Sequence, residues 1–297
     1  MKKFLIYISI FSIIVSASIF FILSQADGYA DAFYLKFTTP KQSNLIIGTS
    51  KAAQGIQPRV LNNILHKNFY NYSFGIYSSP YGSVYLNSIK RKLNEKEDKN
   101  IFILTVDPWS ICSLNESIND SANFSEVKSF LNDITNVCKK PNFKYLFKHF
   151  EGNYYRIFSK NSPFFLHDDG WLEISLNEEQ QSRIRRTNFT INDYRKKLDQ
   201  FGYSSVRFSS LLETIDYLKK FGKVYLVRLP VHPDLMKIEE TLMPNFNSSI
   251  KLAIGKSNGY LDLASYNSIL EYTDGVHLNV ASSEIISTTI AQWIKSN

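Results

Sequence analysis

Three side chains that could perform nucleophilic catalysis lie near opposite ends of this 297-residue chain. Ser50 follows a short apolar run and a glycine, at the end of an expected strand. Asp274 precedes His277 by three residues, and no other histidine in the chain has an aspartate at that spacing. An imidazole held by a carboxylate can take the proton of a serine hydroxyl and stabilise the charge that forms. The pattern therefore indicates acyl transfer, although each half alone also fits a turn serine or a helix-capping aspartate.

Alternating strand and helix patterns surround these residues. Apolar runs of strand length lie at 44–47, 68–74, 101–106, 223–229 and 259–263. Segments with helical spacing lie at 59–65, 81–93, 209–221 (with Gly222 expected as its end), 234–246, 248–254 and 281–294. Strands joined by right-handed helical crossovers form a parallel sheet that is covered on both faces. The sequence therefore predicts an α/β fold, in which ligands bind at the carboxyl ends of the strands.

Candidate site residues follow several of these strands. Gly75 comes after the second strand, Asp107 and Trp109 after the third, and Arg228 at the end of the fourth. Asp107, Trp109 and Arg228 are candidates for substrate binding. The planar guanidinium of Arg228 can bind a carboxylate or phosphate through two hydrogen bonds, but an ordinary salt bridge explains it equally well. Asp107 also fits a structural turn, and His232, a rival general base, also fits a helix start.

The C-terminal run from Asp274 to Asn279, followed by a helix, resembles the last sequence block of the GDSL/SGNH hydrolase family. Gly48-Thr49-Ser50 resembles the first block, with Thr49 where the family usually has aspartate. The resemblance spans residues 44–297, and is nearest to divergent members associated with cell-envelope polysaccharide acylation. It implies a three-layer α/β/α, flavodoxin-like fold with a five-stranded parallel sheet. It also implies a Ser50–His277–Asp274 triad, an oxyanion hole from the N–H groups of Ser50 and Gly75, and no cofactor or metal.

The third block departs from that resemblance. The family normally offers an asparagine here whose side chain helps to bind the oxyanion, whereas this chain has Asp107. An ionised carboxylate cannot donate a hydrogen bond. Loss of one oxyanion donor typically costs about a hundredfold to a thousandfold in rate. Asn71 and Ser73 are candidates to replace it.

The N-terminal segment is apolar from Phe4 to Leu23 and is preceded by Lys2 and Lys3. About twenty apolar residues suffice to span a bilayer, and the two lysines place the N-terminus on the cytoplasmic side. We expect residues 1–25 to be a membrane anchor, or a cleaved signal peptide, followed by a linker at 26–43. In both cases the domain at 44–297 is extracytoplasmic, in the periplasm or at the cell surface.

Residues 111–207 are too long for a simple crossover, and we expect an inserted, mostly helical lid or subdomain there. Helical spacing marks 125–138 and 178–201 within it. Trp171 and its neighbouring carboxylates could contact a sugar, or the tryptophan could simply be packed. Because an exported protein can form disulfides, we also expect Cys112 and Cys138 to be bonded.

The net charge of +7 is modest and spread along the chain, with no Lys/Arg-rich run and no zinc-ligand spacing. This argues against nucleic acid as a partner and suggests an anionic glycan or a membrane surface at most. The sequence thus predicts a membrane-anchored serine esterase that removes O-acyl groups, such as acetyl, from an envelope or extracellular glycan. An O-acyltransferase with the same triad, working with an envelope acyltransferase partner, is the alternative. A catalytically silent SGNH-like domain that binds glycan or acts as a scaffold is a further one.

Overall fold

A five-stranded parallel sheet forms the centre of the computed structural model, which describes residues 1–152, 154–177 and 179–297. Its strands are β1 (Asn44–Ile47), β2 (Phe69–Asn71), β3 (Asn100–Thr105), β8 (Gly222–Arg228) and β9 (Gly259–Asp262). They lie in the order β2-β1-β3-β8-β9. This is the flavodoxin-like order, in which the chain reverses direction beside the first strand. The predicted α/β class and the five parallel strands are confirmed.

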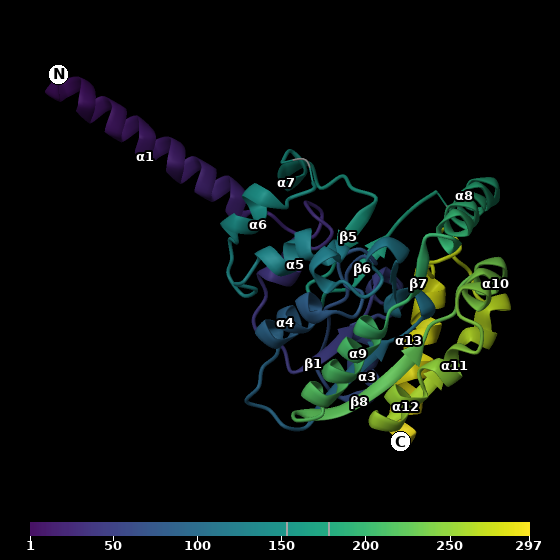
Figure 1. Ribbon diagram of the computed structural model, residues 1–297. Helices are drawn as coiled ribbons and strands as arrows, with labels where there is room; N and C mark the ends of the chain where they lie inside the picture. Colours follow the sequence, from purple (N-terminus) through teal and green to yellow (C-terminus); the bar gives the residue numbers. More distant parts are fainter. Residues whose placement is uncertain (153, 178) are drawn as a thin grey trace.

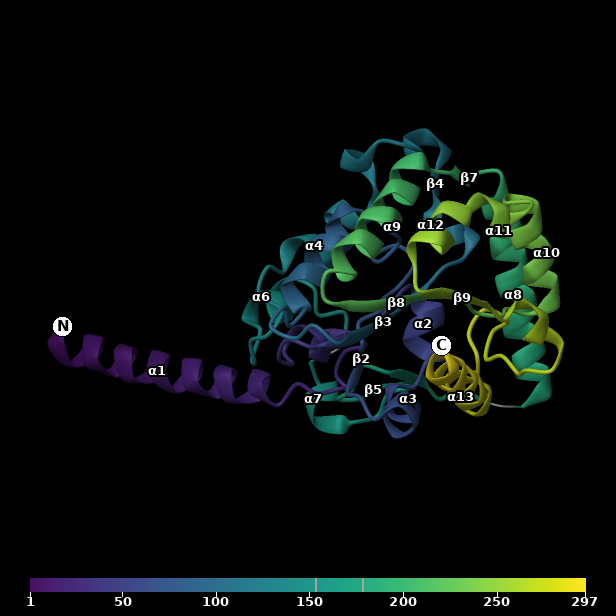
Figure 2. The same cartoon turned by 90° about the horizontal axis from the view of Figure 1, so that it is seen from below.

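Helices cover both faces of the sheet, as Figure 2 shows. Successive side chains of a strand point to opposite faces, so Leu45 and Ile47 belong to one core and Ile46 to the other. The first core is closed by α4 (Ser83–Lys92), α9 (Ser205–Leu218) and α12 (Lys251–Lys256). The second is closed by α2 (Ser50–Gly55), α3 (Pro58–Leu65) and α13 (Val280–Ser296). The apolar stripe of each helix therefore faces a nearly continuous apolar strand surface.

Two predicted boundaries were wrong. The second strand was expected over 68–74, but β2 ends at Asn71. It is an edge strand, and the buried Lys36 ammonium donates to the carbonyl oxygens of Asn71 and Ser73 in place of another strand. Gly222 does not end a helix, because α9 stops at Leu218 and Gly222 begins β8. A Cβ at Gly222 would lie 2.0 Å from the carbonyl oxygen of Asn100, so the approach of β3 requires glycine there.

Residues 111–207 contain short helices and two small antiparallel pairs of strands. The helices are α5 (Phe130–Asp133), α6 (Phe143–Lys148), α7 (Arg156–Ser159) and α8 (Gln180–Leu198). The strand pairs are β4 (Cys112–Leu114) with β7 (Phe201–Tyr203), and β5 (Phe164–Leu166) with β6 (Leu172–Ile174). The predicted helix over 125–138 was wrong: a 3-10 turn, 125–128, precedes α5, and Ser129 caps the new turn. The expected helix start at 178 lies outside the described residues.

Two further helices, α10 (Pro233–Leu242) and α11 (Phe246–Ser249), follow β8, and α10 packs against α8 (Figure 1). The 3-10 helices have the following bounds: η1 (Tyr34–Phe37), η2 (Pro108–Ile111), η3 (Asn115–Ser117), η4 (Ser121–Asn123), η5 (Ser125–Lys128) and η6 (Ala264–Ser268). Trp171 is buried, and its Nε1 donates to the carbonyl oxygen of Gln54 at 2.8 Å, so the tryptophan has a packing role.

The N-terminal helix α1 (Lys2–Ser24) projects from the rest of the molecule (Figure 1). It is long and apolar enough to cross a membrane, by length and composition. The segment after it is not a solvated linker, because Ala26, Ala30, Tyr34 and Phe37 are fully buried in the first core. Helix α1 and the domain are thus joined by a packed segment of chain.

The two cysteines do not pair. Cys112 is buried in β4, whereas Cys138 is exposed, and both thiols are free. The expected disulfide was therefore wrong, because the fold places one sulfur inside the molecule and the other at its surface.

Candidate active site

Ser50, His277 and Asp274 form one chain of hydrogen bonds. The Oγ of Ser50 lies 2.8 Å from Nε2 of His277, and Nδ1 of His277 lies 2.8 Å from Oδ2 of Asp274. All three side chains are half-buried, so they reach solvent from the carboxyl edge of the sheet. The structure therefore brings together residues that are 227 positions apart in the sequence. This is the geometry in which an imidazole can take the hydroxyl proton of a serine.

The loop that carries Asp274 and His277 is built by the aspartate itself. Its Oδ1 accepts hydrogen bonds from the backbone N–H groups of Val276, at 3.0 Å, and His277, at 2.9 Å. Gly275 has a φ of +91°, a conformation that L side chains rarely adopt. One carboxylate therefore both folds the turn and holds the imidazole.

Electrostatics keeps this carboxylate charged. Burial alone would raise the pKa of Asp274, but the attraction of His277 and the hydrogen bonds from His277 and Val276 outweigh it. The pKa falls to about 2. An ionised Asp274 stabilises the imidazolium that forms when His277 takes a proton.

Two neighbouring segments hold the loop from outside. Arg186 of α8 donates from Nε to the carbonyl oxygen of Thr273 at 2.8 Å. The backbone N–H of His232 donates to the carbonyl oxygen of Gly275 at 2.8 Å. His232 thus supports the loop through its backbone, and its Nδ1 accepts from the N–H of Asp234 at the start of α10. The sequence offered two interpretations of His232, a general base or the start of a helix. In the structure its ring caps α10.

The corner that presents Ser50 depends on Gly48. A Cβ at this position would lie 1.9 Å from Oγ1 of Thr105 in β3, so only glycine allows the strands to approach so closely. Ser50 then begins α2 directly after the extended Thr49. The serine is therefore held by backbone geometry, at the point where strand becomes helix.

The backbone N–H groups of Ser50 and Gly75 are the predicted donors of an oxyanion hole. Within the described residues neither N–H donates a hydrogen bond. The loop after β2 is tied to the Ser50 corner, because the Oγ of Ser79 donates to the carbonyl oxygen of Gly48 at 2.8 Å. Backbone N–H groups without an internal partner are the kind of donor from which an oxyanion hole is built.

Neither candidate for a third donor is free to serve. The Nδ2 of Asn71 donates to the carbonyl oxygens of Ala52 and Ile56, at the end of α2. Ser73 is fully buried, and its Oγ donates to the carbonyl oxygen of Ile46 at 3.3 Å. Both side chains support the backbone behind Ser50.

Asp107 has a structural position. Its Oδ1 accepts from the N–H of Ser110 at 3.0 Å and caps the 3-10 turn that begins at Pro108. Its Oδ2 lies 3.4 Å from the Nζ of Lys51, and the same ammonium bonds to Oε1 of Glu239 in α10. Burial lowers the pKa of Lys51, but the two carboxylates outweigh it and raise the pKa above its usual value.

Sequence reasoning missed this buried triplet of Lys51, Asp107 and Glu239. A signal was present, because Glu239 lies three and four positions after Met236 and Leu235, on the apolar face of its helix. A charged residue on a buried face requires a partner. Lys51, which follows Ser50 directly, is that partner.

Arg228 is also committed to ion pairs. Its Nη2 lies 3.5 Å from Oε2 of Glu239, and its Nη1 lies 4.0 Å from Oδ2 of Asp262. The guanidinium lies over the ring of Phe246, and the side chain is buried. Of the two readings that the sequence left open, the structure shows the salt bridge.

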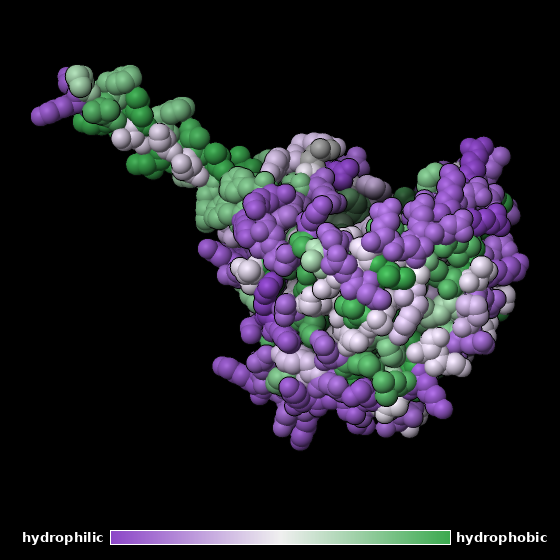
Figure 3. Space-filling view, viewed as in Figure 1, coloured by the Kyte–Doolittle hydropathy of each residue, from purple (hydrophilic) through white to green (hydrophobic). Residues whose placement is uncertain are grey.

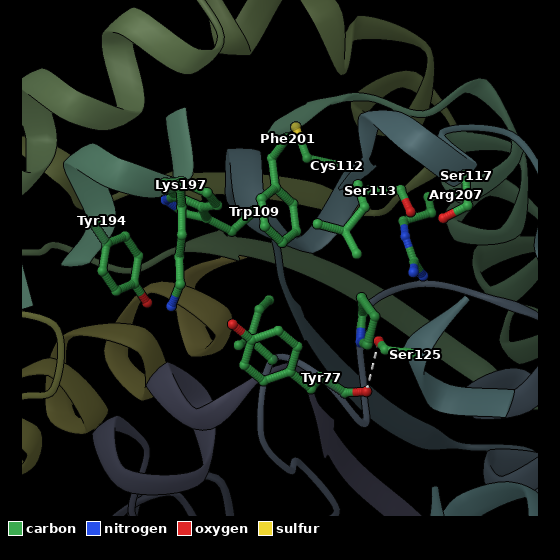
Figure 4. A pocket seen from close by; sticks show the side chains of 13 residues that line it. Tyr77, Trp109, Cys112, Ser113, Ser117, Ser125, Tyr194, Lys197, Phe201 and Arg207 are labelled. Atoms are coloured by element: carbon green, nitrogen blue, oxygen red, sulfur yellow. Dashed lines mark hydrogen bonds between the residues drawn. The ribbon is translucent and has the colours of Figure 1, made fainter. Parts of the chain in front are cut away.

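Trp109 lines a small cavity of about 40 Å³ between the loops after β2 and β3. Figure 4 shows its neighbours Tyr77, Tyr194 and Phe201 around this space. Trp109 packs edge-on against Tyr194 and Phe201, at 4.9 Å and 5.7 Å between ring centroids. Ser50, Asp274 and His277 are not among the lining residues, so this cavity is distinct from the immediate surroundings of Ser50.

A larger and more polar groove, of about 480 Å³, lies beside the Asp274 loop. It is formed by one face of α8 and by residues 268–272, and His232 also lines it. Arg183 and Glu271 pair across it at 3.1 Å. Hydrogen-bonding side chains and an exposed Ile269 give this groove a mixed polar and apolar lining.

No cluster of three histidine, cysteine or acidic side chains that could hold a metal ion occurs in the part of the chain that the structure describes.

Comparison with known proteins gives distant structural likenesses only. No family profile matches the chain, and no curated protein sequence matches it. An inhibitor-bound aryl esterase from M. smegmatis is 11% identical, with a TM-score of 0.37, over 86% of this chain and 99% of that one. A carbohydrate acetylesterase family member from Sinorhizobium meliloti is 9% identical, with a TM-score of 0.35, over 86% and 98%. An acetyl xylan esterase, Est2A, from the rumen bacterium Butyrivibrio proteoclasticus is 10% identical, with a TM-score of 0.28, over 87% and 64%.

Proposed function

We propose that this chain is a divergent SGNH-type serine esterase that removes O-acyl groups, acetyl among them, from a glycan outside the cytoplasm. The observation that carries the proposal is the continuous hydrogen-bond chain from Ser50 through His277 to Asp274. The backbone N–H groups of Ser50 and Gly75, which have no partner among the described residues, support it as oxyanion donors. The apolar helix α1 supports a membrane-anchored, extracytoplasmic location.

The reaction follows from the geometry. His277 accepts the proton of Ser50 at Nε2 as Oγ attacks the ester carbonyl carbon. The negative oxygen that forms is stabilised by the N–H groups of Ser50 and Gly75. His277 then gives the proton to the departing sugar oxygen, and the acyl group stays on the Oγ of Ser50 as an acyl-enzyme. Water, deprotonated by His277, attacks the acyl-enzyme and releases the carboxylic acid and free Ser50.

An O-acyltransferase is the second candidate, and the groove beside the Asp274 loop favours it. A sugar hydroxyl bound there would take the place of water in the second half-reaction, with His277 as its general base. An envelope acyltransferase partner would supply the acyl group. The two reactions share every side-chain role and differ only in what attacks the acyl-enzyme.

The test is covalent labelling of the full-length chain, purified in detergent, with a fluorophosphonate probe. Wild type is compared with Ser50→Ala, His277→Ala and the control Ser117→Ala, which removes a serine outside the triad. We expect labelling of wild type and the control, and none of the two triad variants. Folded wild-type protein that does not label would favour a silent glycan-binding or scaffold domain.

Acyl acceptors are then compared with 4-nitrophenyl acetate as the donor. Release of acetate without any sugar identifies an esterase. Acetylated oligosaccharide that appears only when a sugar acceptor is added, detected by mass spectrometry, identifies a transferase.

A further inference from the structure

Aromatic side chains surround the point where α1 meets the rest of the molecule. The group consists of Phe143, Phe147, Tyr154, Tyr155 and Phe158, from α6, α7 and the residues before α7. Phe143 contacts Phe20 of α1, with ring centroids 5.6 Å apart, and Phe147 stacks on Phe143 at 6.0 Å. We call these five side chains the aromatic collar.

The collar is exposed. Phe147 and Phe158 show 64% and 63% of their surface to solvent, and both tyrosines are also exposed. In Figure 3 the apolar surface of α1 runs on into apolar surface at its base. Figures 1 and 2 place α6 and α7 on two sides of the end of α1. Large apolar side chains gathered at one place on a surface mark an interaction site.

The same segment is strongly basic. Residues 139–160 contain six basic residues and one acidic residue, so they carry most of the net charge of +7. Lys144 and Lys148 pair with Asp133, and Lys160 pairs with Asp27 at 3.5 Å. Lys139 and Lys140 are exposed beside the collar. The charge that the sequence seemed to spread evenly is therefore concentrated at the base of α1.

We propose that the collar and its basic residues rest on the surface of the bilayer that α1 spans, against anionic lipid headgroups. Aromatic rings with polar edges accumulate at the membrane–water interface, and lysines reach the headgroups while their stems cover apolar surface. Lys/Arg clusters next to a membrane helix attract anionic lipids. Because the collar lies on two sides of α1, its side chains can all touch a bilayer surface that is perpendicular to that helix.

This proposal rests on the anchor in the proposed function, since α1 must be retained. Contact through the collar would fix the tilt of the domain relative to the membrane. The carboxyl edge of the sheet would then face a defined direction, and the site would sample glycan at a fixed height above the bilayer.

The test uses the full-length chain in nanodiscs that contain phosphatidylcholine, phosphatidylglycerol and nitroxide-labelled lipid. Cys138→Ser removes the exposed thiol, and single cysteines are introduced as Phe147→Cys, Phe158→Cys or Leu252→Cys for labelling with an NBD fluorophore. Leu252 is the matched control, because it is 56% exposed on α12, away from α1 (Figure 1). Mass measurement of each purified chain establishes that α1 is present.

We expect a blue-shifted emission and nitroxide quenching at positions 147 and 158, and neither change at 252. Adding Lys139→Glu and Lys140→Glu should reduce the quenching at both collar positions when phosphatidylglycerol is present. Emission and quenching at 147 and 158 that equal those at 252 would overturn the proposal. A blue shift without quenching would also overturn it, because a second copy or another protein would then cover the collar.

The outcome is separate from that of the catalytic proposal. Fluorophosphonate labelling of the same nanodisc samples reports on Ser50 whether or not the collar touches lipid. If the mass shows that α1 has been cleaved, the anchor is lost, and with it the bilayer contact proposed for the collar. Fluorophosphonate labelling would still report on the triad.

Discussion

At the scale of single residues, Asp274 has two separable tasks. Its Oδ1 binds the backbone N–H groups of Val276 and His277, and its Oδ2 binds Nδ1 of the His277 ring. The first task folds the loop. In the proposed mechanism the second fixes the proton on Nδ1, so that Nε2 can accept the proton of Ser50. A substitution that keeps the first task and removes the second can therefore separate catalysis from folding.

Asp274→Asn is that substitution. The amide oxygen can still accept the two backbone hydrogen bonds, but the amide N–H2 facing Nδ1 would impose the wrong tautomer on His277. We expect kcat for 4-nitrophenyl acetate to fall by about 10⁴-fold. The melting temperature should stay close to that of wild type. A variant that retains more than a tenth of wild-type kcat would show that Asp274 does not orient the imidazole.

At the scale of elements, three segments meet behind the nucleophile. Lys51 comes from the first turn of α2, Asp107 follows β3, and Glu239 comes from α10. Their side chains are almost fully buried, so the ion pairs are screened little by water. These ion pairs fix the start of α2, and with it Ser50, against the sheet. They also fix it against α10, the helix whose start supports the Asp274 loop.

Lys51→Met should destabilise the protein strongly. Removal of one partner leaves Asp107 and Glu239 as neighbouring buried carboxylates, and losses of this kind cost roughly 3–5 kcal/mol. Thermal and urea unfolding of the detergent-solubilised chain measure the loss. The double variant Lys51→Met, Glu239→Gln should recover part of it, because one of the two repelling charges is removed. An equal or larger loss in the double variant would argue that packing, not charge, explains the effect.

At the scale of the whole molecule, buried lysines connect the N-terminal segment to the domain. Lys92 of α4 donates from Nζ to the carbonyl oxygen and Oγ1 of Thr39, and to the carbonyl oxygen of Val137. Lys36 likewise donates from Nζ to the carbonyl oxygens of Asn71, at the end of β2, and Ser73, just after it. The segment between α1 and β1 is therefore held against the rest of the domain by these hydrogen bonds.

The pH dependence of stability should report on Lys92. Burial lowers its pKa from the usual 10.5 to about 7. Between these values the unfolded chain binds more protons than the folded one, so the folded state gains stability as pH rises from about 7 to about 10, by at most about 1.4 kcal/mol per pH unit.

Lys92→Met provides the reference for this measurement. The difference in free energy of unfolding between wild type and Lys92→Met should shift in favour of wild type across that pH range. A difference that does not change with pH would show that the hydrogen bonds to Thr39 and Val137 keep the ammonium charged in the folded state.

The sequence determined much of the architecture and pointed to the three candidate catalytic residues. Apolar runs bounded by glycine predicted the parallel sheet, and the spacing from Asp274 to His277 fixed a local turn, because both depend on neighbours along the chain. The length and composition of α1 likewise made it a candidate membrane span.

Only the tertiary structure decided which polar groups are free. Asn71, Asp107 and Arg228 looked available in sequence, but each is bound to segments that are distant along the chain. The same holds for the two cysteines, whose positions in the fold leave both thiols free. Hydrogen-bond and ion-pair partners are set by distances in space, and a sequence pattern reports only on residues within a few positions of one another.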